Sequence, residues 1–327
     1  MSPPRPTVVL TGGTSGIGQR TAVALAQKGA DLVLTARSKT RADSTIEMIE
    51  RAAPGTRVDI HYGDFGDLAS VAVLGREIAS RHSRIDVLIN NAGIHAFKPR
   101  VTKDGYPEMV AVNYLAPWLF TNILLETVVR SAPSRIVTVA SQASRQGAGF
   151  DPLAALVDKR QFSARGSSVI YGQTKLLNIM FSMELAHRLT GTGVAVNCLC
   201  PGFNVTGLGR ELWFAAPLER LLTWLKVGNP ERGAGIIVSL ASDPAFAGVT
   251  GGYFSVSDAR RLTPVAPGDD PQALQALWQA TAERVAAFYR DEVVERRSHP
   301  MATSEPSPPV RYLHLRCKTC GSCIDDM

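Results

Sequence analysis

The sequence contains no run of about 18 consecutive apolar residues, the length that a helix needs to cross a bilayer. Its opening segment, MSPPRP, leads directly into the first expected strand and leaves no room for a secretory signal or a membrane anchor. Lys and Arg together number 35 against 29 Asp and Glu, yet they form no basic cluster, so nucleic acid binding is not expected. We therefore expect a soluble cytoplasmic protein without a membrane span.

Cysteine is also scarce, with five residues in 327. Cys198 and Cys200 lie on an apolar stretch and are expected to be reduced core residues, as is usual in the cytosol. The other three form a CxxCxxC pattern near the chain end: Cys317, Cys320 and Cys323. Thiolates at this spacing ligate zinc or iron–sulfur clusters, but a closed site needs four ligands and the tail offers only His314 as a fourth. The preceding Pro- and Ser-rich segment indicates a disordered tail over 299–327, and we assign no metal site.

What the chain does have is a regular alternation of short apolar runs and helical patterns. The runs expected as strands span 7–10, 31–35, 58–62, 86–90, 135–140 and 194–199. Such alternation predicts an α/β fold, a single Rossmann-like, doubly wound parallel sheet with helices on both faces. The carboxyl ends of parallel strands converge on one crevice, where ligands bind. The residues at those ends are Asp64, Asn90, Ala92, Gly93, Ser141, Pro201 and Gly202.

A glycine-rich turn, TGGTSGIG, follows the first expected strand. Gly12, Gly16 and Gly18 let the backbone turn sharply and approach a ligand closely. The helix that begins near Ile17 directs its unpaired N–H groups and the positive end of its dipole toward a phosphate. The spacing departs from the GxGxxG fingerprint of many dinucleotide binders, so the turn alone does not identify its ligand.

Tyr171 and Lys175 are four residues apart on an expected helix, a spacing that points a phenol and an ammonium in the same direction. A cation held near a phenol stabilises the phenolate and lowers its pKa from about 10 toward the range of a working proton donor. Taken alone, the spacing also fits an ordinary surface helix with the aromatic ring in the core and the lysine in water. The accompanying motifs decide between these two interpretations.

Several motifs, in a fixed order, resemble those of the short-chain dehydrogenase/reductase family. They are TGGTSGIG at 11–18, NNAG at 90–93, Asn113, Ser141, YGQTK at 171–175 and PGFNVT at 201–206. The resemblance extends over about residues 6 to 260. The segment YGQTKLLNIMF, the long stretch between Ser141 and Tyr171, and the ending GGYFSVSDARR are similar to the retinol dehydrogenase-like and bacterial carbonyl reductase branch.

The resemblance implies hydride transfer between a nicotinamide cofactor and a carbonyl carbon, with a proton supplied to the oxygen. Tyr171 would supply that proton, and Lys175 would lower the tyrosine pKa and bind the nicotinamide ribose. Ser141 would hold the substrate oxygen, and Asn113 would anchor a water that connects Lys175 to solvent. The last two also have structural interpretations, Ser141 as a hydroxyl that starts a turn and Asn113 as an amide bonded to backbone.

The choice of cofactor depends on the end of the second strand, where an acidic residue favours NAD(H) and an arginine accommodates the 2′-phosphate of NADP(H). Arg37 stands there with no carboxylate beside it in sequence, so NADP(H) is expected to be preferred over NAD(H), unless Arg37 is only a solvated loop cation. Asp64 matches the family position that contacts the adenine ring. The full set of cofactor-binding residues implied by the resemblance is Gly12, Thr14, Ser15, Gly16, Ile17, Gly18, Arg37, Asp64, Asn90, Ala92, Gly93, Tyr171, Lys175, Pro201, Gly202 and Thr206.

The segment over 203–227 occupies the position of the family's substrate lid. It is rich in leucine at helical spacing and carries three large aromatic residues, Trp213, Phe214 and Trp224. So apolar a lid predicts a bulky lipophilic substrate, whether aromatic, polyketide-derived, terpenoid or retinoid-like. The alternative is that these residues pack onto the core or onto a partner subunit. The stretch 142–168, with Phe150 and Phe162, is a second candidate for the pocket wall.

The predicted organisation is one cofactor-binding domain over 1–260, a C-terminal helical extension over 261–298, and the tail. Asp270-Pro271 has the form of an N-cap and first turn of an amphipathic helix, which is expected to dock on the domain. Helices around 115–129 and 171–189 match those through which family members dimerise, so a homodimer is expected. The expected activity interconverts a ketone or aldehyde and an alcohol. A non-catalytic NADP(H) sensor is the alternative, and the intact proton relay argues against it.

Overall fold

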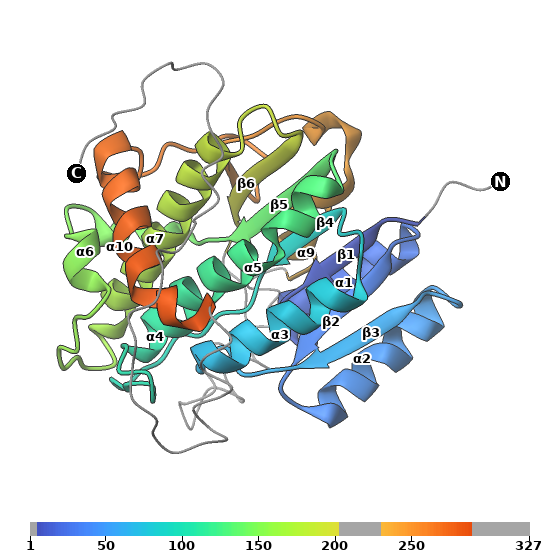
Figure 1. Ribbon diagram of the computed structural model, residues 1–327, viewed down its shortest axis with the longest axis horizontal. Helices are drawn as coiled ribbons and strands as arrows, with labels where there is room; N and C mark the ends of the chain where they lie inside the picture. Colours follow the sequence, from blue (N-terminus) through green and yellow to red (C-terminus); the bar gives the residue numbers. More distant parts are fainter. Residues whose placement is uncertain (1–4, 203–229, 290–327) are drawn as a thin grey trace, which may run out of the picture.

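The computed structural model describes residues 5–202 and 230–289 of the chain. Seven parallel strands form one sheet in the order β3-β2-β1-β4-β5-β6-β7 (Figure 1). Their bounds are β1 Thr7–Leu10, β2 Asp31–Ala36, β3 Val58–Tyr62, β4 Val87–Asn90, β5 Ser134–Val139, β6 Val194–Cys200 and β7 Gly252–Ser255. The strand order reverses between β1 and β4, and ligands of open parallel sheets bind at such a switch point. The predicted α/β fold with a single parallel sheet is confirmed.

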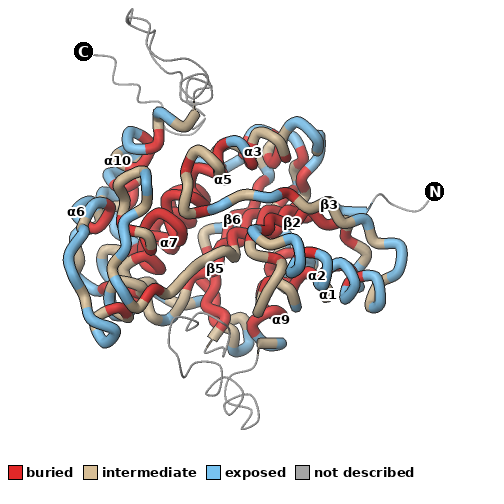
Figure 2. The backbone as a smooth tube through the Cα atoms, turned by 90° about the horizontal axis from the view of Figure 1, so that it is seen from below, coloured by how far each residue is buried: buried red, intermediate tan, exposed pale blue. Residues whose placement is uncertain are grey.

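Helices cover both faces of this sheet (Figures 1 and 2). Val8 and Val87 pack in one hydrophobic cluster, whereas the next residues, Val9 and Leu88, pack in the other, because successive strand residues point to opposite faces. One layer consists of α1 Gly16–Gln27, α2 Lys39–Ala52 and α9 Pro230–Ser242. The other consists of α3 Leu68–Arg81, α5 Ala116–Arg130 and α7 Ser167–Arg188. The core therefore lies on both sides of the sheet, as a doubly wound fold requires.

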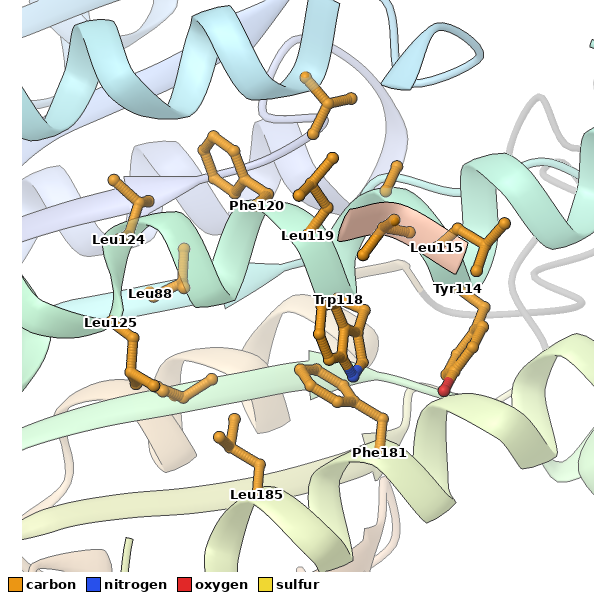
Figure 3. Close-up of a cluster of buried hydrophobic side chains, with 14 of the residues drawn as sticks. Leu88, Tyr114, Leu115, Trp118, Leu119, Phe120, Leu124, Leu125, Phe181 and Leu185 are labelled. Atoms are coloured by element: carbon orange, nitrogen blue, oxygen red, sulfur yellow. The ribbon is translucent and has the colours of Figure 1, made fainter. Parts of the chain in front are cut away.

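The C-terminal helix α10, Pro271–Tyr289, packs on the second layer. Asp270 caps its start by accepting hydrogen bonds from the backbone of the first turn. The ring of Trp278 lies 5.1 Å from that of Trp118 on α5 and 6.0 Å from that of Phe181 on α7. Figure 3 shows Trp118 and Phe181 directed toward each other in this cluster. The helix thus covers the seam between α5 and α7.

The last strand, β7, was not among the strands predicted from the sequence. Of its four residues, GYFS, only Tyr253 and Phe254 favour a strand, whereas the equally short β1 and β4 each contain three aliphatic residues in a row. Its partner is β6, to which it pairs in parallel from Asn197 to Cys200. Backbone pairing with β6, rather than the local sequence, makes this segment a strand.

Short elements complete the part of the chain that the structure describes. They are α4 Glu108–Val110, the π-helical turn η1 Ala111–Leu115, the 3₁₀ turn η2 Gln142–Gly147, α6 Pro152–Ala155 and η4 Pro244–Phe246. Within residues 5–202 and 230–289, the structure shows no helix with the length and apolar character needed to cross a membrane.

Candidate active site

The glycine-rich turn lies at the switch point, between β1 and α1. Gly12 and Gly16 have φ angles of +66° and +56°, in the left-handed region that favours glycine. A Cβ atom on Gly18 would lie 2.2 Å from the carbonyl oxygen of Gly12, so a larger residue there would displace backbone. Ser15 is the N-cap of α1, which places the first N–H groups of this helix at the carboxyl end of the sheet. The turn is therefore a backbone cradle suited to a phosphate.

Two side chains that the sequence interpretation did not single out hold this turn against β4. Thr11 is completely buried, and its Oγ1 accepts hydrogen bonds from the backbone of Asn91 and Ala92, both at 3.0 Å. The side-chain amide of Asn91 donates to the carbonyl oxygens of Thr11 and Gly12, at 3.0 and 3.2 Å. The NNAG motif was read as part of the cofactor site, and its second asparagine fixes the shape of the cradle.

The other members of the NNAG motif differ in their surroundings. Asn90 is buried and donates to Thr121 Oγ1 on α5 at 2.8 Å, so its side chain is directed into the helix layer. A Cβ atom on Gly93 would lie 3.2 Å from Asn113 Oδ1 and 3.4 Å from Lys175 Nζ. Because Gly93 has no side chain, the side chains of Asn113 and Lys175 can both approach its backbone closely.

Asn113 lies in the π-helical turn η1 and is completely buried. Its Oδ1 accepts from the backbone N–H of Ile94 at 2.7 Å, and its Nδ2 donates to the Ile94 carbonyl at 2.9 Å and to Thr174 Oγ1 at 3.0 Å. These bonds to backbone fit the structural interpretation of Asn113, and its water relay stays a prediction. Single π turns inside helices are frequent at functional sites, and no sequence pattern indicated this one.

Tyr171, Lys175 and Ser141 come together at the carboxyl end of β5. The hydroxyl of Ser141 lies near enough to the phenol of Tyr171 to act on its pKa, and the Ser141 Oγ accepts from the backbone N–H of Ala143 at 3.1 Å. Lys175 Nζ donates to the carbonyl oxygen of Val139 at 2.9 Å and lies 5.7 Å from the centre of the Tyr171 ring. The helical spacing of Tyr171 and Lys175 therefore does place both side chains on one site.

The protonation of this pair is set chiefly by burial. Burial raises the pKa of Tyr171 above its ordinary value, and the hydrogen bond to Ser141 acts in the opposite direction. Burial lowers the pKa of Lys175 to about 8. The sequence predicted a lowered pKa for Tyr171, and in this arrangement that prediction is wrong, because Lys175 donates to Val139 while desolvation of the phenol dominates. A phenol with a raised pKa is protonated at neutral pH, which is the form that the reduction of a carbonyl needs.

Gly172 lets the turn that follows Ser141 pack directly on α7. A Cβ atom on Gly172 would lie 2.2 Å from the carbonyl oxygen of Ala143 and 3.3 Å from Cβ of Gln146. One residue later, the backbone of Gln173 lies 3.2 Å from the position of a Cβ atom on Gly147. The sequence signal was available, because a glycine in the middle of a helix costs about 1 kcal/mol relative to alanine and calls for a packing reason.

His95 is a further residue of the site that the sequence interpretation missed. Its ring stacks on that of Tyr171, with centroids 4.7 Å apart and planes at 16°, and on that of Phe97 at 4.5 Å. Its Nε2 lies 3.0 Å from Ser167 Oγ at the start of α7. Only the position of His95, two residues beyond the NNAG motif, hinted at a place in the site.

Arg37 and Asp64, the two residues predicted at the adenosine end of the cofactor, follow β2 and β3. Arg37 NH1 lies 3.9 Å from Asp64 Oδ1, and the two side chains are 65% and 60% exposed. An ion pair this exposed contributes little to stability, so Arg37 can turn to a ligand at low cost. The backbone N–H of Gly66 donates to Asp64 Oδ1 at 2.9 Å and fixes the aspartate.

The carboxyl end of β6 closes the site from the other side. The backbone N–H groups of Gln142 and Gly202 donate to the thiol of Cys200, at 3.1 and 3.4 Å, so this buried cysteine joins the segment after Ser141 to the Pro201-Gly202 turn. The predicted lid over 203–227 lies outside the described residues, and so do Thr206, Trp213, Phe214 and Trp224. The tail cysteines and His314 lie outside them as well.

The stretch 142–168 borders two cavities. Phe150 lines a cavity of about 290 Å³ together with Arg160 and Gln173. Phe162 lines a smaller cavity of about 50 Å³. Both aromatic residues that were predicted to line a pocket wall therefore face cavities.

Comparison with known proteins identifies relatives along most of the chain. A family profile described as short chain dehydrogenase matches residues 6–152. Human retinol dehydrogenase 14 is 36% identical over 83% of this chain and 84% of its own length. A protein of Streptomyces sp. (strain C5), provisionally named as the daunorubicin C-13 ketoreductase DnrU, is also 36% identical, over 86% of this chain and 93% of its own length.

Solved structures show the same architecture. An uncharacterized protein from Mycobacterium paratuberculosis has a TM-score of 0.68 and 27% identity, over 86% of this chain and 93% of that protein. A provisionally assigned NAD(P)-dependent gluconate 5-dehydrogenase from Beutenbergia cavernae, solved with bound NADP, has a TM-score of 0.59 and 29% identity over 77% of this chain and 94% of that protein. With the glycine-rich turn and the Ser141, Tyr171 and Lys175 cluster in place, these matches show that the chain belongs to the short-chain dehydrogenase/reductase family of oxidoreductases, on its retinol dehydrogenase-like side.

Proposed function

We propose that the chain is an NADP(H)-dependent oxidoreductase that interconverts a ketone or aldehyde and an alcohol on a lipophilic substrate. The observation that carries this proposal is the placement of Tyr171 beside Ser141 and the ammonium of Lys175, at the same end of the sheet as the backbone cradle. A proton donor, a second hydroxyl and a cation are the groups that carbonyl reduction requires.

In the proposed reduction, bound NADPH supplies the hydride. Tyr171 donates its phenolic proton to the substrate oxygen, and Ser141 holds that oxygen in place by a hydrogen bond. Lys175, charged below its pKa of about 8, stabilises the phenolate that remains. The buried bond from Lys175 to Val139 fixes the ammonium in position for this role.

Two features suit the cradle to a dinucleotide. Gly18 packs closely against the backbone of Gly12, and the N-terminus of α1 presents free N–H groups to a phosphate. The NADP-bound relative at 29% identity supports a nicotinamide cofactor. The preference for NADP(H) over NAD(H) rests on Arg37, because an arginine after β2 binds a 2′-phosphate and does nothing for a 2′-hydroxyl.

A lipophilic substrate is supported by the apolar sequence of 203–227. The names of two relatives, which refer to retinol and to daunorubicin, point to substrates with large carbon frameworks.

A homodimer and a cytoplasmic location stay predictions. Size-exclusion chromatography of the purified chain tests the first of these.

The decisive experiment is a panel of ketones and aldehydes incubated with the protein and NADPH, followed by the loss of NADPH absorbance. We expect turnover of bulky apolar carbonyls above that of small ones. Tight NADPH binding without turnover of any carbonyl or oxidation of any alcohol would favour the alternative, a sensor of NADP(H).

Replacement of Arg37 by alanine should weaken NADPH binding by about 1.5–3 kcal/mol, because a charge-assisted contact to the 2′-phosphate is lost. NADH binding should stay nearly unchanged. Lys39→Ala is the matched control, since it removes a cation two residues away that is paired with Asp43. The measurement is fluorescence titration of both cofactors. An equal loss of affinity for NADPH and NADH would show that Arg37 does not bind the 2′-phosphate.

Replacement of His95 by alanine should lower kcat by about 2- to 10-fold, because the Tyr171 ring loses a stacking partner worth roughly 0.5–1.5 kcal/mol. His95→Phe keeps the stack and should retain most of the rate. NADPH affinity should be the same in all three proteins. If both variants lost the same activity, the imidazole itself, rather than its stacking, would be needed.

A further inference from the structure

A second cluster of ionisable side chains lies at the outer edge of the sheet. Asp59 and His61 are on β3, and His82 is the C-cap of α3. Asp59 Oδ2 lies 3.1 Å from His61 Nε2 and 3.2 Å from His82 Nε2. β3 is separated from β5, which leads to Ser141, by three strands of the sheet. The cluster is therefore independent of the proposed reaction.

Among the residues that the structure describes, hydrogen bonding satisfies one ring nitrogen of His61 but not the other. Its side chain is completely buried, and both ring nitrogens face carboxylates, Asp59 at Nε2 and Glu77 Oε1 at 3.3 Å from Nδ1. A neutral imidazole has one N–H, so if Nε2 donates to Asp59, then Nδ1 presents a lone pair to Glu77. In keeping with this, Nδ1 is buried without a hydrogen bond of acceptable geometry.

A divalent cation between the three ligand atoms would resolve this conflict. We propose that Asp59, His61 and His82 bind one Zn²⁺ ion through Oδ2 and the two Nε2 atoms. The Nδ1–H group of His61 then donates to Glu77, which is the usual carboxylate–histidine arrangement behind a zinc ligand. Glu77 is itself held by Arg81 at 3.1 Å.

The dimensions and the donor set fit zinc. Zn²⁺ with N and O ligands at about 2.0–2.2 Å keeps neighbouring ligand atoms roughly 3.3 Å apart in a tetrahedron. Two of the three separations are already 3.1 and 3.2 Å, and all three ligand atoms lie within 4.8 Å of one another. The Asp59 side chain is 42% exposed, which leaves an entry path and room for water as the fourth ligand. The ion would fasten β3 to the end of α3.

The test is Zn²⁺ binding to the full-length chain, expressed without a histidine tag and carrying Cys317→Ser, Cys320→Ser and Cys323→Ser. These three changes remove the tail thiols, because thiolates are zinc ligands in general, and the resulting protein is the parent of the variants below. After treatment with a chelator, equilibrium dialysis against ZnCl₂ at pH 7.5 should give one zinc per chain. The melting temperature should rise with Zn²⁺, because an ion that binds the folded state stabilises it.

Three substitutions decide where the zinc binds. His82→Gln and Asp59→Asn change partly exposed side chains, so the fold should persist, and each should abolish stoichiometric binding and the shift in melting temperature. Glu77→Gln should weaken binding by about 10- to 100-fold, because Glu77 orients the ligand His61. His187→Gln, an exposed histidine in the last turn of α7, is the matched control and should bind as the parent does. Failure of the parent to take up one zinc, or undiminished uptake by both His82→Gln and Asp59→Asn, would overturn the proposal.

Discussion

Tyr171→Phe is expected to slow hydride transfer by about 10²–10⁴-fold, the contribution of a positioned general acid. The substitution removes one oxygen and keeps the ring, so the stack on His95 and the contact with Lys175 persist. NADPH affinity should stay close to that of the wild type, because the backbone cradle at Gly12 and Gly18 is unchanged. The measurement is single-turnover reduction of an accepted carbonyl, together with an NADPH titration.

The control for this variant is Tyr106→Phe. Tyr106 also carries a hydroxyl with one hydrogen bond, to the carbonyl oxygen of Arg284 at 3.2 Å, but it lies outside the cluster of Ser141 and Lys175. It should turn over at the wild-type rate. A near wild-type rate for Tyr171→Phe would mean that the proton comes from another group, and the roles assigned to Ser141 and Lys175 would fail with it.

Most of the strands predicted from the sequence contain at least three consecutive apolar or β-branched residues, because burial on both faces imposes a continuous hydrophobic run. β6, from Val194 to Cys200, is of this kind, and all its residues are buried. β7 differs because its four residues, from Gly252 to Ser255, become a strand through pairing with β6. Local composition holds too little information to identify so short an edge strand.

The candidate site could be predicted where the fold itself brings residues together at the carboxyl ends of the strands. Ser141 follows β5 and Tyr171 lies on α7, and the rule that strand ends meet at one edge of the sheet places Ser141 there. The stacking of His95 on Tyr171 depends on the path of the chain after β4, which no periodic pattern specifies. The π turn that holds Asn113 likewise depends on how α5 packs.

Electrostatics were the least predictable property of the site. The spacing of Tyr171 and Lys175 correctly indicated that the two side chains meet, but the pKa of a phenol depends on burial as much as on a nearby cation. Lys175 donates a hydrogen bond to Val139, and desolvation raises the pKa of Tyr171 and lowers that of Lys175, so the neutral form of each group is favoured. Sequence spacing carries no information on this desolvation.

Gly172→Ala is the second substitution with a large expected effect, and it acts through packing alone. In an open helix this change stabilises a protein by about 1 kcal/mol, because alanine has the higher helix propensity. At Gly172 the new Cβ atom would lie 2.2 Å from the carbonyl oxygen of Ala143, a backbone atom that cannot rotate away. The turn η2 must move, at a cost of about 1–3 kcal/mol for overpacking.

The displaced turn begins at Ser141, whose Oγ accepts from the N–H of Ala143, so the shift moves Ser141 relative to Tyr171. We expect kcat/KM to fall by about 10²-fold, the loss typical of a 1 Å misplacement in an active site, together with a lower melting temperature. Gly235→Ala is the matched control, since Gly235 is an exposed glycine in helix α9 and no neighbouring atom of the described residues lies within 4 Å of its Cβ position. That variant should melt higher than the wild type and keep full activity. If Gly172→Ala behaved as Gly235→Ala does, η2 would not need to lie against α7, and the position of Ser141 would have to be fixed by Cys200 and β5 instead.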